Sequence, residues 1–218
     1  MGGTSDRALA RTLLERHGKT YAEESGIRMR DTPQPLYQTL VLAHLLSARI
    51  RASVAVASAR ALFDAGLRSP RRMADATWQH RVDALGAGGY RRYDERTSTQ
   101  LGDAAELLLE EYGGDLRRMR DAAGGDLEEL RSALRKVPGL GSAGSDIFLR
   151  EVQGVWPEIS PYLDGKAVQG AERLGLPTDS GKLARLVEED DVTGFASALV
   201  RASLDKSVVD EVRQAADG

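Results

Sequence analysis

Apolar residues recur along this chain with the spacing of an α-helix rather than with the alternation of a β-strand. Between Asp94 and Tyr112, the residues Leu101, Ala105, Leu108 and Tyr112 fall at helical intervals and so share one face. Runs of β-branched residues are scarce, and aromatic residues make up only 5% of the chain. The pattern therefore predicts an all-α fold.

Glycines, prolines and polar clusters divide this pattern into helices and connections. The glycine-rich stretch 86–89 is expected to be a turn. The stretch 154–162, with Trp156, Pro157 and Pro161, is expected to be an extended linker. The predicted helices are 7–18, 36–48, 53–65, two short ones within 69–85, 94–112, 116–122, 126–136, one beginning near 142, 164–175, 179–187 and 192–216.

Composition excludes several classes of chemistry. The chain has no cysteine, which excludes disulfides, thiolate nucleophiles, thiolate zinc sites and cysteine-ligated iron–sulfur clusters. His17, His44 and His80 are scattered and lack acidic partners at ligand spacing, so we expect no metal and no cofactor. The longest apolar stretch, 36–48, is too short to cross a bilayer, and no apolar leader follows the N-terminus. We therefore expect a cytoplasmic protein without a membrane partner.

Charge by itself does not point to nucleic acid. The net charge is −3, whereas nucleic-acid binders are more often basic. Most of the basic residues are arginines, whose planar guanidinium suits phosphate, although a GC-rich genome would give the same excess. The distinctive signal lies in a short motif instead.

That motif is the turn that follows Lys136. Two glycines separated by one apolar residue permit a tight reversal with positive φ, and the residue between them can insert between the two flanking helices. Backbone amides at the start of the next helix would then face outward and could dock a DNA phosphate without reading a base. The alternative is a plain loop between helices. The residues expected to form this phosphate-binding hairpin, within 137–144, are Pro138, Gly139, Leu140, Gly141, Ser142 and Ala143.

Together with other motifs, the turn resembles the helix-hairpin-helix DNA glycosylase superfamily, which includes endonuclease III-like and alkyladenine glycosylase-like enzymes. The resemblance covers roughly residues 40–175. It rests on the ordered segments Leu45-Leu-Ser-Ala48, 93–97, Val137-Pro-Gly-Leu-Gly141, Gly154-Val-Trp-Pro157 and Leu163-Asp164. It implies two helical domains with a DNA cleft between them, one formed by 36–152 and the other by 1–35 together with 153–218.

The departures from the family pattern bear on the chemistry. Bifunctional members carry a nucleophilic lysine two positions after the second hairpin glycine, where this chain has Ala143, and many carry a four-cysteine cluster that this chain lacks. The resemblance therefore implies a monofunctional glycosylase with Asp164 as its catalytic carboxylate. Such a group could stabilise positive charge on the sugar or activate a water. A simple helix N-cap is the alternative role for Asp164, and both roles can hold together.

Other candidate residues carry weaker signals. Arg49, Tyr90 and Tyr93 are candidates for a wedge or a base pocket, with structural or surface roles as the alternative. Lys166 could act as a displaced amine nucleophile, but a solvated helix lysine is the preferred interpretation.

Three functional hypotheses follow from the sequence. The first is a monofunctional DNA-repair glycosylase that removes a damaged base. The second is a bifunctional glycosylase/AP lyase that uses Lys166 or Lys136. The third is a DNA-binding protein that keeps the fold without catalysis. In each case the expected partner is double-stranded DNA, lesion-containing for the enzymes, bound by a monomer associated with the nucleoid.

Overall fold

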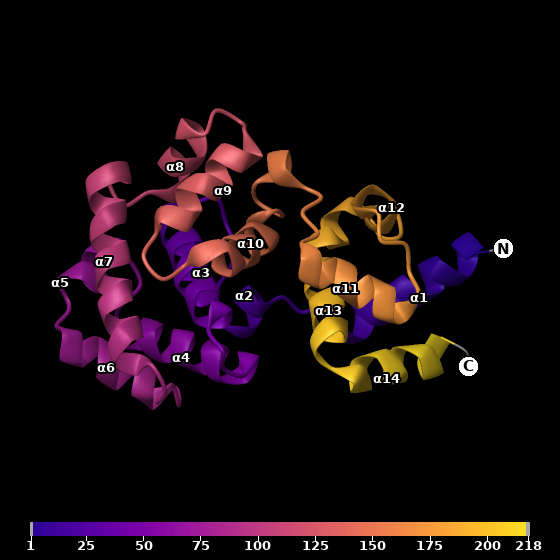
Figure 1. The fold of residues 1–218 in the computed structure, drawn as a ribbon, viewed down its shortest axis with the longest axis horizontal. Coiled ribbons are helices and arrows are strands. Elements are labelled where there is room, and N and C mark those ends of the chain that lie inside the picture. Colours follow the sequence, from indigo (N-terminus) through magenta and orange to yellow (C-terminus); the bar gives the residue numbers. More distant parts are fainter. Residues whose placement is uncertain (1, 217–218) are drawn as a thin grey trace. The chain divides into compact units, whose positions relative to one another are not determined.

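A computed structural model describes residues 2–216, and these residues form an all-α fold, which confirms the predicted class (Figure 1). By internal contacts the chain forms two compact units. Unit 1 combines the chain up to Tyr21 with the chain from Leu149 onward, and unit 2 is the continuous segment 22–148. The sequence placed these divisions after residues 35 and 152. Segment 22–35 groups with unit 2 partly because Asp31 forms an ion pair with Arg120.

Unit 2 is built around one buried helix, α3 (Pro33–Ser47). The side chains of Leu36, Tyr37 and all residues from Thr39 to Leu45 are buried, which is typical of a helix covered by several neighbours. The other helices of unit 2 are α2 (Tyr21–Glu24), α4 (Ala52–Asp64), α5 (Pro70–Asp75), α6 (Trp78–Ala87), α7 (Asp94–Tyr112), α8 (Leu116–Ala122), α9 (Leu127–Lys136) and the first part of α10 (Gly141–Val152).

One buried arginine joins three of these helices. The Arg81 guanidinium donates hydrogen bonds to the carbonyls of Met73, Ala76 and Ser98, over distances of 2.8–2.9 Å. Gly102 in α7 makes room for it, since a Cβ there would lie 2.9 Å from Arg81 Nη2. This polar contact fixes α7, whose first turns carry several pocket residues described below.

Unit 1 is centred on α13 (Val192–Leu204), whose Phe195, Ala198 and Leu199 are fully buried. Gly170 of α11 (Gly165–Leu174) packs directly on this helix, because a Cβ at Gly170 would lie 1.8 Å from the Leu199 carbonyl oxygen. The remaining elements of unit 1 are α1 (Gly2–His17), the 3₁₀ turn η1 (Pro157–Ile159), α12 (Ser180–Ala184), the 3₁₀ turn η2 (Glu189–Asp191) and α14 (Lys206–Ala216).

Side-chain caps set many of the helix starts. A Ser, Thr or Asp oxygen accepts a backbone N–H from the first turn, which satisfies a donor that has no partner inside the helix. The residues that cap helices in this way are Ser69, Thr77, Asp115, Asp126, Asp164 and Asp179.

Besides shifts of helix ends such as the start of α1 at Gly2 and of α3 at Pro33, three predicted elements differ from the structure. The single helix expected over 192–216 is wrong, because Asp205 adopts an extended conformation and its carboxylate accepts the Ser207 N–H, which starts α14 anew. The helix expected over 179–187 is shorter and spans Ser180–Ala184. The stretch 154–162 is not extended throughout, since it contains η1, and its Trp156 is fully buried.

Candidate nucleic-acid interface

The turn between α9 and α10 has the backbone geometry that the sequence predicts. Gly139 and Gly141 have φ values of +79° and +60°, a region that glycine enters without steric cost. Leu140 between them is buried and packs on Gly144, where a Cβ would lie 2.7 Å from Leu140 Cδ1. The turn therefore brings α9 and α10 together as a hairpin.

The exposed side of this hairpin presents the N-terminus of α10. Gly141, Ser142 and Ala143 are exposed, and the first turn of α10 contains no acidic residue. Backbone N–H groups at a helix N-terminus carry partial positive charge and bind anions well. The hairpin can thus receive a phosphate oxygen.

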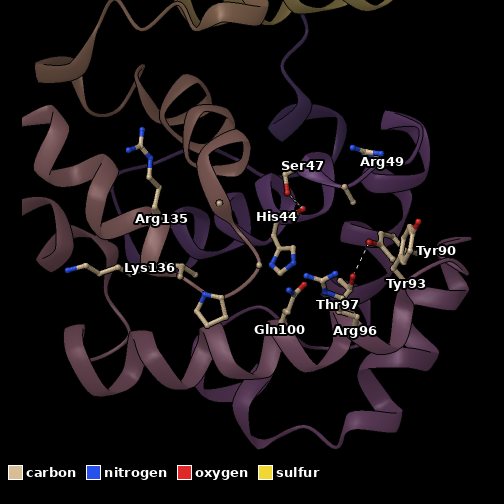
Figure 2. Close-up of a pocket in the computed structure, with 15 residues that line it drawn as sticks. His44, Ser47, Arg49, Tyr90, Tyr93, Arg96, Thr97, Gln100, Arg135 and Lys136 are labelled. Carbon is tan, nitrogen blue, oxygen red and sulfur yellow. Dashed lines mark hydrogen bonds between the residues drawn. The ribbon is translucent and has the colours of Figure 1, made fainter.

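Two side chains from other helices lie directly beneath Gly139. A Cβ at this position would lie 2.3 Å from His44 Cε1, 2.6 Å from His44 Nε2 and 2.8 Å from Gln100 Oε1. Gln100 of α7 hydrogen-bonds the His44 side chain, and Figure 2 shows the two side by side. Burial lowers the pKa of His44 to about 4, so the ring is neutral at pH 7. Gly139 is therefore required at this point both for its φ and for its lack of a side chain.

Next to the hairpin, unit 2 contains a pocket of about 670 Å³. It lies among the end of α3, the start of α7 and the hairpin, and Figure 2 shows its lining side chains. The lining residues are His44, Ser47, Ala48, Arg49, Tyr90, Tyr93, Arg96, Thr97, Gln100, Arg135, Lys136, Val137, Pro138, Gly139 and Gly141.

The pocket lining is positively charged, and no acidic residue in the lining balances this charge. Its four cations are Arg49, Arg96, Arg135 and Lys136, all of them exposed, and the lining includes no Asp or Glu. Within residues 2–216, none of these four side chains forms an ion pair. Their charge is therefore available to an anion from outside.

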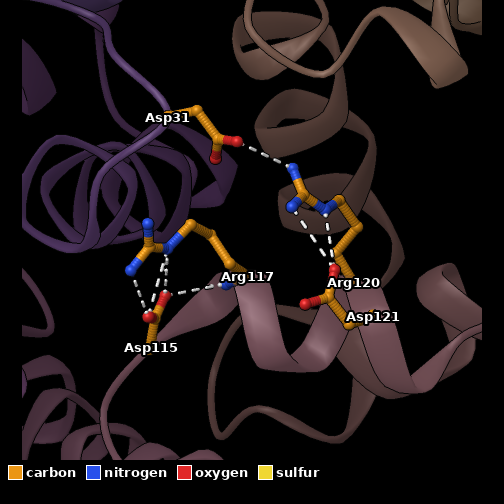
Figure 3. Close-up of polar contacts among 5 residues, drawn as sticks. All are labelled: Asp31, Asp115, Arg117, Arg120 and Asp121. Atoms are coloured by element: carbon orange, nitrogen blue, oxygen red, sulfur yellow. Dashed lines mark hydrogen bonds and ion pairs between the residues drawn. The ribbon is translucent and has the colours of Figure 1, made fainter.

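Two arginines of α8 differ from these pocket cations. Arg117 binds the Asp115 carboxylate at 2.7 Å, and Arg120 lies between Asp31, at 3.0 Å, and Asp121, at 3.3 Å (Figure 3). The Arg117 side chain holds the pKa of Asp115 below its ordinary value, which keeps that carboxylate charged. The charge of these two arginines is thus balanced within the protein, and their side chains stabilise unit 2 rather than offering a site.

The two tyrosines predicted as wedge or pocket residues both line this pocket, in different ways. Tyr90 is buried, and its hydroxyl forms a 2.9 Å hydrogen bond with Thr97 Oγ1. Tyr93 is 47% exposed, has a left-handed φ of +67° and carries the Arg92 guanidinium 5.0 Å from its ring centroid. Arg49, the third predicted wedge or pocket residue, is also part of this lining.

Asp164 lies in unit 1, and each of its two carboxylate oxygens has a partner within the protein. One carboxylate oxygen accepts the Ala167 N–H at 2.9 Å, which is the predicted N-cap, and the other forms an ion pair with Arg150. The side chains of Asp164 and Arg150 are only 6% and 3% exposed. Nearby, the Gln153 amide bonds both the Tyr162 N–H and its carbonyl, which fixes the segment before Asp164. The carboxylate is thus rigidly placed, with its negative charge balanced by a buried guanidinium.

The two candidate lysines occupy different surroundings. Lys166 in α11 is exposed and donates a 3.1 Å hydrogen bond to Gln169, as expected for a solvated helix lysine. Lys136 lines the basic pocket beside the hairpin. Among residues 2–216, no three His, Cys, Asp or Glu side chains are grouped as a metal site requires, and no helix is long and apolar enough to span a membrane.

Sequence reasoning missed four residues of the pocket. His44 was interpreted as a core or surface residue rather than as part of a site, and Gln100, Arg96 and Arg135 were not singled out. A signal did exist for Arg96 and Gln100, since they lie one helical turn apart on α7. The signal for Arg135 was its position beside Lys136 at the entry of the hairpin.

Among solved structures, this chain is similar to that of endonuclease III trapped in a covalent intermediate with DNA, in an estranged-adenine complex. The two chains are 15% identical with a TM-score of 0.49, and the alignment covers 88% of this chain and 83% of the other. No family model and no curated protein match the sequence.

Proposed function

We propose that this chain is a DNA-binding protein of the DNA glycosylase type that docks double-stranded DNA on the basic pocket and hairpin of unit 2. The observation that carries the proposal is the set of four unpaired cations around exposed helix N-terminal amides, with no acidic side chain in the lining. Such a surface suits the phosphate backbone, which supplies most of the affinity of non-specific DNA binding. The proposal keeps the sequence-based expectation of a monomer that acts in the cytoplasm with the nucleoid.

A salt titration of duplex binding tests this proposal. Fluorescence anisotropy with a labelled, undamaged duplex should give an affinity that falls steeply with salt concentration. Arg135→Gln should weaken binding. Arg71→Gln is the matched control: it also removes one positive charge, but Arg71 is exposed on α5 outside the pocket, so binding should not change. Equal losses in the two variants, or no binding at low salt, would refute docking at the pocket.

Base excision is a second candidate function, favoured by the fixed orientation of the Asp164 carboxylate. A carboxylate held in one position can stabilise a positively charged sugar or orient a water during monofunctional hydrolysis. Arg150, however, already balances its charge, and this reduces the electrostatic help that Asp164 could give. For this reason binding without excision is the leading proposal.

Excision is tested with duplexes that contain alkylated, deaminated or oxidised bases. If Asp164 is catalytic, wild-type protein releases one class of base and Asp164→Asn releases far less. Absence of an abasic product from every duplex would exclude excision and leave the binding proposal intact.

The lyase alternative is favoured by the position of Lys136 in the pocket lining. A Schiff-base nucleophile would be trapped by borohydride on abasic DNA. The adduct would disappear in Lys136→Ala if that amine is responsible, and in Lys166→Ala if Lys166 is. No adduct with wild-type protein would exclude the lyase route.

A further inference from the structure

The Tyr93 side chain is a large aromatic group exposed on the lining of the basic pocket. Its ring is about half exposed, although burial of an aromatic side chain is normally favourable. The Arg92 guanidinium lies 5.0 Å from the ring centroid and contributes a cation–π contact. An exposed ring next to four free cations is the combination that binds unstacked nucleotides, with bases on the ring and phosphates on the cations.

The backbone of Tyr93 supports a role beyond packing. Among residues 2–216 it is the one non-glycine residue with a positive φ, a conformation that costs about 1–2 kcal/mol in an L-residue. Tyr93 precedes α7 without providing a side-chain cap, so its side chain does not serve the helix start. The strained conformation holds the ring as part of the pocket lining instead.

The floor of the pocket offers little to read the edge of a base. The Tyr90 hydroxyl is bonded to Thr97, and the His44 ring is bonded to Gln100. The Ser47 hydroxyl donates to the His44 carbonyl at 2.7 Å. Each of these groups already has one partner within the protein, so recognition would rest mainly on stacking and charge, which are shared by all four bases.

Volume and charge also limit the ligand. A pocket of about 670 Å³ lies within the range of roughly 300–1,000 Å³ typical of small-molecule sites, large enough for one nucleotide. The lining contains no carboxylate, so it holds no group to stabilise a sugar cation during excision. The pocket is therefore suited to holding a nucleotide, and its lining supplies no carboxylate for hydrolytic excision of the base.

We propose that the basic pocket of unit 2 binds one unpaired nucleotide of any base, stacked on Tyr93, and that the chain thereby selects disrupted duplex structure rather than a chemically damaged base. This inference rests on the proposed docking of duplex DNA at the same pocket. It specifies that docking is strongest for duplex DNA that contains an unpaired nucleotide.

The test compares the affinity of three labelled duplexes of the same sequence. One is fully paired, one carries a single unpaired thymidine, and one carries a single unpaired abasic residue. The thymidine duplex should bind most tightly. The abasic duplex also carries an extra unpaired residue, but it should lose this advantage because it has no base to stack. An unpaired guanine and an unpaired oxidised guanine should bind equally well.

Two variants at Tyr93 isolate the ring. Tyr93→Asn removes the ring while keeping a residue that tolerates positive φ, and Tyr93→Phe keeps the ring without its hydroxyl. We expect Tyr93→Asn to lower affinity for the thymidine duplex by roughly fivefold to a hundredfold, and to lower affinity for the paired duplex by less, since that duplex offers no base to stack on the ring. Tyr93→Phe should behave as wild type.

The outcomes separate this inference from the docking proposal. Equal affinity of wild-type protein for the paired and thymidine duplexes overturns the inference and leaves docking standing. A preference that survives in Tyr93→Asn, or that persists for the abasic duplex, also overturns it. If neither duplex binds at low salt, docking itself fails and this inference fails with it.

Discussion

Replacing Gly139 by alanine should destabilise unit 2 much more than the same change at Gly141. Both glycines have positive φ, so each alanine incurs about 1–2 kcal/mol of backbone strain. At Gly141 the new Cβ would meet no atom within 4 Å, whereas at Gly139 it would lie 2.3 Å from a buried ring atom of His44. Forcing a methyl group into a packed site costs a further 1–3 kcal/mol or so. The expected losses are therefore about 2–5 kcal/mol for Gly139→Ala and about 1–2 kcal/mol for Gly141→Ala.

The measurement is urea-induced unfolding followed by far-ultraviolet circular dichroism. Both changes restrict the unfolded chain equally, so that contribution cancels when the two variants are compared. Combining Gly139→Ala with His44→Ala removes the ring that the methyl group strikes, and should remove most of the extra loss. If Gly139→Ala is no less stable than Gly141→Ala, the contact between the hairpin and His44 does not determine which residue is allowed here.

Three further predictions concern charge. Lys136→Gln should reduce the slope of log affinity against log salt for duplex binding by about 1. An unchanged slope would mean that this amine does not meet a phosphate. The folded-state pKa of His44, about 4, lies below the ordinary 6.5, so the neutral ring contributes stability above pH 6.5 that is lost as pH falls toward 4. This loss reaches about 3 kcal/mol, and urea unfolding at several pH values should show it in wild type and not in His44→Ala. Arg150→Met should cost about 3–5 kcal/mol because it leaves the Asp164 carboxylate buried without its partner. In thermal unfolding, the double variant with Asp164→Leu should be more stable than Arg150→Met, and a lower stability would contradict this account of the pair.

Local signals in the sequence were sufficient for most helices and for the hairpin. Asp126 is a clear N-cap from the sequence, and its carboxylate accepts the N–H groups of Glu128 and Glu129. The two hairpin glycines likewise have the positive φ that their spacing predicts. These features depend on residues only a few positions apart, so the local pattern contains the information.

The candidate site depends on distant residues, and the sequence could not bring these together. Arg150 lies in α10 and Asp164 at the start of α11, with an irregular segment between them. The spacing rules that pair residues within one helix do not apply across such a segment. His44 and Gly139 meet only because α3 runs beneath the hairpin. The rotation of a helix decides such contacts, and single-sequence periodicity fixes that rotation too coarsely to name a partner.

The division of the chain has a consequence for its synthesis. Unit 2 is continuous, so all of it is available once Phe148 has left the ribosome. Unit 1 needs both ends, because α1 packs against α13 and α14 and buries Ala10 and Leu13 completely. At about 5–20 residues per second, α1 waits roughly 10–30 s for α13 to be made. During that interval its apolar face is exposed to chaperones and to other nascent chains, while unit 2 folds ahead of it.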